Sequence, residues 1–150
     1  TDITGIYPDE LIDEKIIDDH LEDIMNFINY DKNTKSIYLV AHNCDSFDRL
    51  FLISSIKKYN ETHTEKLDYK HIYYIDTLNL AKKLLPNIKS YSLRSLSHYY
   101  NIKSGNHRAL SDTICLRELY HHFVREIADH LNKSHKDILN NPDIVYDFIN

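Results

Sequence analysis

The chain reads SIYLVAHNCDSFD over residues 36–48, and this stretch decides the fold class. Its first half, Ile37 to Ala41, is a short apolar run rich in β-branched residues, which is typical of a buried strand in a parallel sheet. Its second half is polar and leads into a segment whose apolar residues, from Phe47 onward, recur at helical spacing. A buried strand that runs directly into a helix predicts an α/β fold.

A second strand of the same kind is predicted at residues 71–75, where the chain reads HIYYI. The following Asp76-Thr77 is a suitable N-cap for a helix over 78–85, which Pro86 ends. Further helices are predicted at 15–30, after Ser92, at 108–131 and, more weakly, in 132–150. We therefore expect one domain over residues 1–131 with a helical appendage at 132–150. Because sheets usually have about four to six strands, we expect further strands before Thr1.

The overall composition fits one intracellular domain with a basic centre. The net charge of −5 is unevenly spread: residues 51–110 carry ten basic and four acidic side chains, whereas residues 1–50 carry four and twelve. A basic centre fits nucleic-acid phosphates, although lysines that solvate helix faces would give the same count. Short apolar runs exclude a membrane span, and two cysteines with no signal peptide argue against secretion. We expect a cytoplasmic or nuclear protein of a microbe or a virus.

Polar residues gather where the first predicted strand ends. Open α/β sheets place their functional sites at the carboxyl ends of strands. His42 and Asn43 follow this strand directly, and Asp48 would lie in the first turn of the next helix. The alternative is that Asp45 or Ser46 caps this helix and that Asp48 is a surface acid matched to the helix dipole.

A second candidate group pairs His107, in a predicted loop, with Asp112, in the helix that follows. A hard cation such as Mg²⁺ prefers carboxylate oxygens, and a histidine can accept a proton from water near neutral pH. This spacing also arises often by chance. A hydrolase that uses Cys44 as its nucleophile is a weaker alternative.

Four motifs follow one another in order: AHN-x3-FD at 41–48, DTL at 76–78, KSYSL at 89–93 and H-x4-D at 107–112. This set resembles the DEDDh 3′→5′ exonucleases of the ribonuclease H-like superfamily over about residues 4–120. It is most similar to the three-prime repair exonuclease branch and its viral relatives.

The resemblance implies a ribonuclease H-like fold that hydrolyses single-stranded DNA or RNA from its 3′ end with two Mg²⁺ or Mn²⁺ ions. The residues that match the family by position are Asp48 and Asp112 as metal ligands, His107 as general base, and His42, Asn43 and Phe47 beside the substrate. By contrast, we interpret Asp76 as a helix cap and not as a ligand.

The chain departs from the family pattern in two places. Cys44 stands where the family usually has a glycine, and the family's first motif, Asp-x-Glu, occurs nowhere in the 150 residues. We therefore expect an exonuclease domain that lacks its first strands, with an upstream segment or self-association completing the sheet. The alternative is a non-catalytic relative that binds nucleic acid or a partner without cutting.

Overall fold

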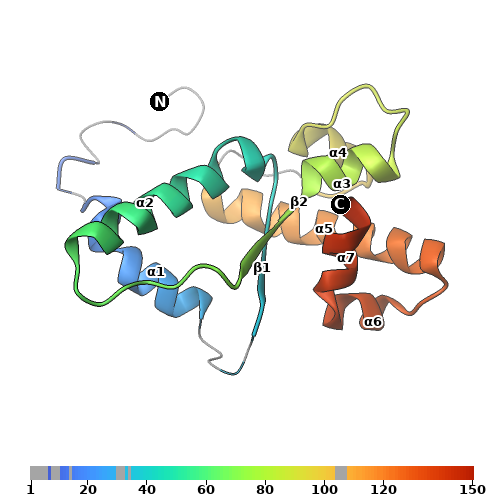
Figure 1. Ribbon diagram of the computed structural model, residues 1–150. Coiled ribbons are helices and arrows are strands. Elements are labelled where there is room, and N and C mark those ends of the chain that lie inside the picture. Colours follow the sequence, from blue (N-terminus) through green and yellow to red (C-terminus); the bar gives the residue numbers. More distant parts are fainter. Residues whose placement is uncertain (1–6, 8–10, 14, 30–32, 34, 104–107) are drawn as a thin grey trace.

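A computed structural model describes residues 7, 11–13, 15–29, 33, 35–103 and 108–150. Its described part is a mixed α/β structure in which helices cover both faces of a small parallel sheet (Figure 1). The predicted fold class is therefore confirmed. None of the described helices is both long and apolar enough to cross a bilayer.

The sheet consists, within the described residues, of β1 (Ile37–Ala41) and β2 (Ile72–Asp76). The two strands run parallel, as the buried apolar runs predict, and their register places Ala41 opposite Asp76. Successive side chains of a strand point to opposite faces, so alternate residues of β1 and β2 enter two separate cores. The parallel register brings the two polar strand ends side by side.

One face of the sheet is covered by α1 (Leu21–Ile28) and α2 (Asp48–Thr62). The helix predicted at 15–30 begins later than expected, because a 3-10 turn, η2 (Ile17–Asp19), precedes α1. The core on this face is small and consists of five buried residues, namely Leu21, Met25, Ile56, Tyr59 and Ile72.

The opposite face carries the larger core and the remaining helices. These are α3 (Thr77–Leu84), α4 (Leu93–Tyr99), α5 (Ala109–Leu131), α6 (His135–Asn140) and α7 (Pro142–Ile149). The longest, α5, spans almost the whole of the predicted helix at 108–131. It contributes Leu119, Phe123 and Ile127, all fully buried.

The C-terminal helices pack into this larger core. Ile138 of α6 and Val145 of α7 are fully buried. The ring of Tyr146 makes edge contacts with Tyr38 of β1 at 5.9 Å and with Tyr73 of β2 at 5.4 Å. Within the segment at 132–150, α7 therefore lies directly on the sheet, whereas α6 packs against α5 and α7.

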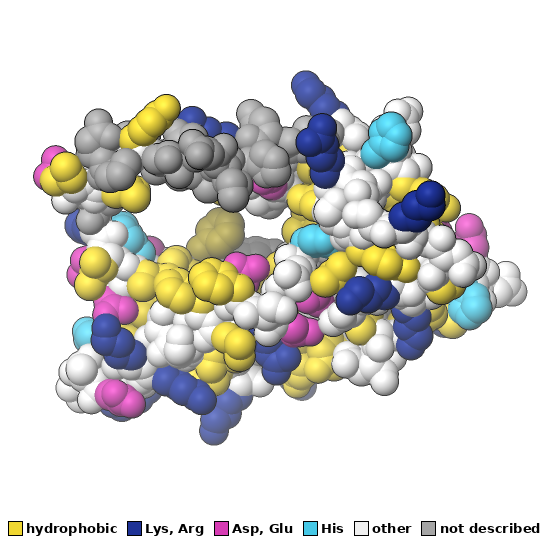
Figure 2. Space-filling model, turned by 90° about the horizontal axis from the view of Figure 1, so that it is seen from above, with side chains coloured by type: hydrophobic (Ala, Val, Ile, Leu, Met, Phe, Trp, Pro, Cys, Tyr) yellow, Lys and Arg dark blue, Asp and Glu magenta, His cyan; other side chains and the backbone are white. Residues whose placement is uncertain are grey.

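The first half of α2 presents an apolar surface to solvent. Phe47, Leu50 and Phe51 are 68%, 60% and 45% exposed, and the two phenylalanine rings stack with their centroids 5.8 Å apart. Hydrophobic side chains gather on the face of the molecule seen in Figure 2. Among the described residues, each strand also pairs on one side only. Both features mark surfaces without a partner in the described part of the chain.

Candidate functional site

The two strand ends are held together by the buried carboxylate of Asp76, the last residue of β2. Its Oδ1 accepts hydrogen bonds from the backbone N–H groups of Asn43 at 2.8 Å and Leu78 at 2.9 Å. Its Oδ2 accepts from the N–H of Asp45 at 3.2 Å. The bond from Leu78 confirms that Asp76 caps α3. The other two bonds fix the loop that follows β1 and leads to Asp48.

The turn of this loop is made by Asn43, whose φ of 59° lies in the left-handed region. Asparagine is one of the few residues other than glycine that adopts this conformation readily. Cys44 is not among the described residues with positive φ. A glycine is therefore not needed at Cys44, and this departure from the family pattern leaves the turn without backbone strain.

His42 is bonded within the fold through both ring nitrogens. Its Nδ1 lies 2.9 Å from the hydroxyl of Thr77, and its Nε2 lies 2.9 Å from the backbone oxygen of Tyr91. Burial lowers the pKa of His42, which favours the neutral ring. Nε2–H then donates to Tyr91, and Nδ1 accepts from Thr77. His42, predicted beside the substrate, therefore links the end of β1 to α3 and to the segment before α4.

Phe47 and Asp48 project outward from the end of this loop. Asp48 is the first residue of α2 and is exposed, as is the ring of Phe47. Asn43 is also exposed at the backbone turn, where its side-chain oxygen accepts a hydrogen bond from Ser46 at 3.2 Å. The loop thus presents an amide, an aromatic ring and a carboxylate next to one another in the sequence.

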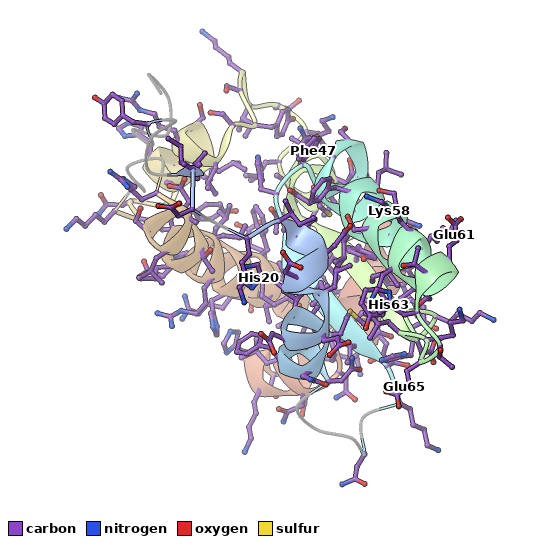
Figure 3. The ribbon with its side chains drawn as sticks, turned by 90° about the vertical axis from the view of Figure 1, so that its left-hand side faces the viewer. His20, Phe47, Lys58, Glu61, His63 and Glu65 are labelled. Atoms are coloured by element: carbon purple, nitrogen blue, oxygen red, sulfur yellow. The ribbon has the colours of Figure 1, made fainter. Side chains whose placement is uncertain are left out.

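The second predicted ligand, Asp112, lies in the first turn of α5 and is half-buried. Asp48 begins a different helix, α2, whose neighbouring Phe47 is labelled in Figure 3. Neither carboxylate has a hydrogen-bond or ion-pair partner among the described residues. His107, the predicted general base, lies outside the described residues.

The three potential metal donors that lie closest together do not fit a hard cation. Cys44, Asp45 and Asp76 offer atoms within 4.8 Å of one another. However, both oxygens of Asp76 already accept backbone hydrogen bonds, and Asp45 pairs with Arg49 at 3.3 Å. Burial raises the pKa of Cys44 to about 12. A protonated, buried thiol is neither a ligand for Mg²⁺ nor an active nucleophile.

The carboxylates of Asp48 and Asp112 offer the type of donor atom that a hard divalent cation prefers. Both are oxygen donors, and neither is used in the described fold. Mg²⁺ and Mn²⁺ prefer carboxylate oxygens and water over sulfur or nitrogen ligands. The unused acids of the two candidate segments are therefore better ligands than the closely spaced group around Asp76.

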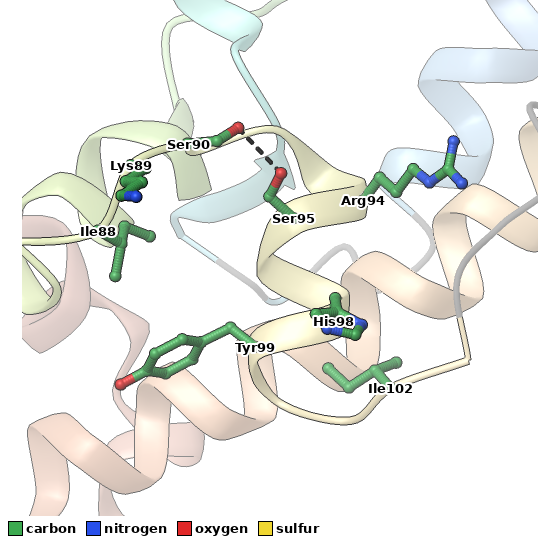
Figure 4. Close-up of a pocket in the computed structure, with 8 residues that line it drawn as sticks. All are labelled: Ile88, Lys89, Ser90, Arg94, Ser95, His98, Tyr99 and Ile102. Atoms are coloured by element: carbon green, nitrogen blue, oxygen red, sulfur yellow. Dashed lines mark hydrogen bonds between the residues drawn. The ribbon is translucent and has the colours of Figure 1, made fainter.

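A pocket of about 610 Å³ lies between α4 and the segment that precedes it (Figure 4). Its lining residues are Ile88, Lys89, Ser90, Arg94, Ser95, His98, Tyr99 and Ile102. The Ser95 hydroxyl donates to Ser90 at 2.9 Å, while Arg94 extends outward at the rim. The described residues that line the pocket include the cations Lys89 and Arg94 and no acidic side chain, so the pocket suits an anionic ligand.

Sequence reasoning missed two features of this region. The bonds from Asp76 to the neighbouring loop and the contact of His42 with Tyr91 both join segments that are far apart in the chain. The available signal was the parallel pairing itself, since polar residues after two adjacent parallel strands meet at one sheet edge.

Comparison with known proteins finds similarity to an exonuclease family, to DNA polymerases and to a plant exonuclease. Residues 1–120 match the exonuclease family RNase_T. The chain is 31% identical over 141 residues to the PolC-type DNA polymerase III of Bacillus subtilis, an alignment that covers 93% of this chain and 9% of the polymerase. It is 38% identical over 92 residues to the chloroplastic/mitochondrial exonuclease DPD1 of Arabidopsis thaliana, covering 56% of this chain and 27% of that protein.

A third relative, the PolC-type DNA polymerase III of Caldanaerobacter subterraneus, is 28% identical over 130 residues, covering 86% of this chain and 8% of the polymerase. The chain thus spans less than a tenth of these polymerases and about a quarter of the plant exonuclease. No solved structure matches the chain significantly.

Proposed function

Because this chain belongs to the RNase_T exonuclease family, we propose that it is a 3′→5′ exonuclease domain with a two-metal mechanism and a histidine general base. Exonucleases of this family generally use divalent metal ions. The observation that carries the proposal is the pair of unused carboxylates, Asp48 and Asp112, each in the first turn of a helix and each at the position of a family motif.

In this mechanism Asp48 and Asp112 would hold Mg²⁺ or Mn²⁺. When bound, such ions stabilise charge on the scissile phosphate and acidify the attacking water. His107 accepts the proton of that water on a ring nitrogen and so acts as general base. Asn43 and Phe47 contact the terminal nucleotide. The hydrogen bonds of Asp76 keep the loop that carries these residues in one conformation before substrate arrives, which reduces the entropic cost of binding.

The proposed substrate is a single-stranded 3′ end, with DNA as the first candidate because two relatives are named as DNA polymerases. The pocket beside α4 supports this choice. Lys89 and Arg94 supply positive charge for phosphates, and the exposed ring of Tyr99 offers a surface on which a base can stack. Figure 2 shows several Lys and Arg side chains over α3 and α4. We also propose that the protein is intracellular and that it belongs to the three-prime repair branch of the family.

The test follows the release of nucleotides from a 5′-labelled single-stranded DNA in the presence of Mg²⁺. Since the 150 residues contain no Asp-x-Glu, we assay the chain alone and joined to a preceding strand segment that carries this motif. We expect little cutting by the chain alone and stepwise 3′ shortening by the joined protein. Asp112→Asn should abolish the shortening and weaken Mg²⁺ binding, whereas Asp137→Asn, on α6, should change neither.

A second candidate function is a module that binds nucleic acid without cutting it. The absence of an Asp-x-Glu motif from the 150 residues favours this alternative, because two of the carboxylates that the family uses for its metal ions are then missing from this chain. If the joined protein binds single-stranded DNA but leaves it intact at every Mg²⁺ and Mn²⁺ concentration, the exonuclease proposal is wrong and the binding module is the better description.

A further inference from the structure

A row of basic side chains follows one face of α5. Arg117, His121 and Arg125 are spaced four residues apart, so they lie above one another on one side of the helix. Together with Glu118 and His122 they line a cleft of about 530 Å³. Both arginines are exposed, and neither forms an ion pair within the described residues. Two guanidinium groups are therefore available to a ligand from solvent.

The electrostatic potential in this cleft is positive. Burial lowers the pKa of His121, and so do four neighbouring bases on α5 and α6, namely His135, Arg125, Arg117 and His122. The lining contains one carboxylate, that of Glu118, against two arginines, which leaves a net charge of +1 with the histidines neutral. The cleft therefore suits an anion, and protonated histidines would add to its charge.

A series of aromatic rings joins this cleft to the pocket beside α4. The rings of Tyr99 and Tyr100, at the end of α4, have their centroids 4.9 Å apart, and Tyr100 stacks on His122 at 4.8 Å. Tyr99 lines the pocket and His122 lines the cleft, so the two cationic sites are neighbours. Tyr99 is also 56% exposed. Proteins that bind single strands combine cations for the phosphates with aromatic rings on which bases stack.

We propose that the cleft on α5 is a second phosphate-binding site, which contacts the backbone of the same single strand that occupies the pocket beside α4. This inference rests on the proposed function for the identity of its ligand. Guanidinium groups bind phosphate oxygens through paired hydrogen bonds. At about 1.5 Å per residue, Arg117 and Arg125 lie about 12 Å apart along the helix. A stacked strand covers this length with about three to four nucleotides of about 3.4 Å each, so the two arginines contact different phosphates.

The test measures the binding of a fluorescent single-stranded DNA by anisotropy over a salt series, without divalent ions so that no strand is cut. Arg117→Gln/Arg125→Gln should weaken binding about threefold or more, and should lower the slope of log affinity against log salt by about 1.4, or about 0.7 for each phosphate contact that is lost. The matched control is Lys35→Gln/Lys70→Gln, which removes the same charge from exposed residues at the starts of the two strands. This control should keep the original slope.

A second measurement uses the unmodified chain and so does not rely on the folding of any variant. A phosphate bound beside His121 should raise the pKa of this ring, because a nearby negative charge favours the protonated form. The histidine signals are titrated by NMR with the single strand and, separately, with inorganic phosphate. We expect the strand to raise the pKa of His121 more than an equal concentration of free phosphate does.

The proposal is overturned if only inorganic phosphate raises the pKa of His121, since the cleft then holds a free anion. It is also overturned if Arg117→Gln/Arg125→Gln binds the strand as tightly as the unmodified chain, even when the protein joined to Asp-x-Glu cuts DNA. By contrast, a strand that both sites bind and that is never cut would contradict the exonuclease proposal alone.

Discussion

The carboxylate of Asp76 lies 2.8 Å from the backbone nitrogen of Asn43, so the end of β2 directly holds the turn that follows β1. This bond crosses between two strands whose last residues are paired in the parallel register. A single buried side chain thereby fixes both the start of α3 and the loop that leads to Asp48.

Replacing Asp76 with alanine should destabilise the fold strongly. The change leaves three partly buried backbone N–H groups without their acceptor, and a fully buried unsatisfied donor costs about 1–3 kcal/mol. Because water can reach part of this loop, we expect a total loss of about 2–3 kcal/mol in the free energy of unfolding, measured with urea. Asp68→Asn is the control, because this exposed carboxylate accepts one backbone N–H, that of Lys70 at 3.0 Å, and otherwise lies 3.6 Å from a ring nitrogen of His71. Equal losses in the two variants would contradict the central role of Asp76.

His42 should make the stability depend on pH. Burial lowers its pKa from the ordinary 6.5, so the unfolded chain takes up the proton first as the pH falls. The contribution of the neutral ring is therefore complete above pH 6.5 and is lost below it. We expect the urea midpoint to decrease between pH 7.5 and pH 5, and less so in His42→Gln. Because burial also lowers the pKa of His121, His121→Gln is titrated in parallel to separate the two contributions.

His107→Ala should impair catalysis and spare metal binding in the protein that carries Asp-x-Glu. Loss of a general base typically reduces turnover by about a hundred-fold or more. Elevated pH should restore part of the activity, because hydroxide needs no base. The pH profile of kcat and the Mg²⁺ affinity are measured side by side. If His107→Ala has normal turnover, this histidine is not the base.

Neutralising the pocket beside α4 should weaken the binding of single-stranded nucleic acid. In Lys89→Gln/Arg94→Gln, the slope of log affinity against log salt should decrease by up to about 0.7 for each phosphate contact that is lost. Fluorescence anisotropy over a salt series gives the slope. The control is Lys133→Gln/Lys136→Gln near α6. An unchanged slope in the first variant would mean that its two cations only solvate the surface.

The exposed apolar surface of α2 should make the chain self-associate. Phe47, Leu50 and Phe51 lie together in solvent, and each described strand has an unpaired edge, which is an association hazard. We expect sedimentation velocity to show species larger than a monomer as the concentration rises. Leu50→Lys should shift the distribution toward monomer more than Leu131→Lys, a change at the end of α5. A chain that stays monomeric throughout would contradict this prediction.

The parts of the structure that could be predicted from sequence are those with a local signal. The apolar runs at 37–41 and 71–75 predict both strands and their parallel pairing, and the helical spacing of apolar residues predicts α5 to within a residue or so. The bonds of Asp76 to the neighbouring loop depend on the strand register, which no local pattern specifies. The packing of 132–150 on the sheet likewise depends on tertiary contacts.

The position of α7 has a consequence for the way the chain acquires its structure during synthesis. Val145 completes the larger core, and Tyr146 covers Tyr38 and Tyr73 on the sheet. These residues leave the ribosome well after both strands, so part of this face of the sheet stays uncovered until α7 has been synthesised. A nascent chain halted before residue 142 should therefore remain sensitive to proteases and should depend on chaperones until α7 is released.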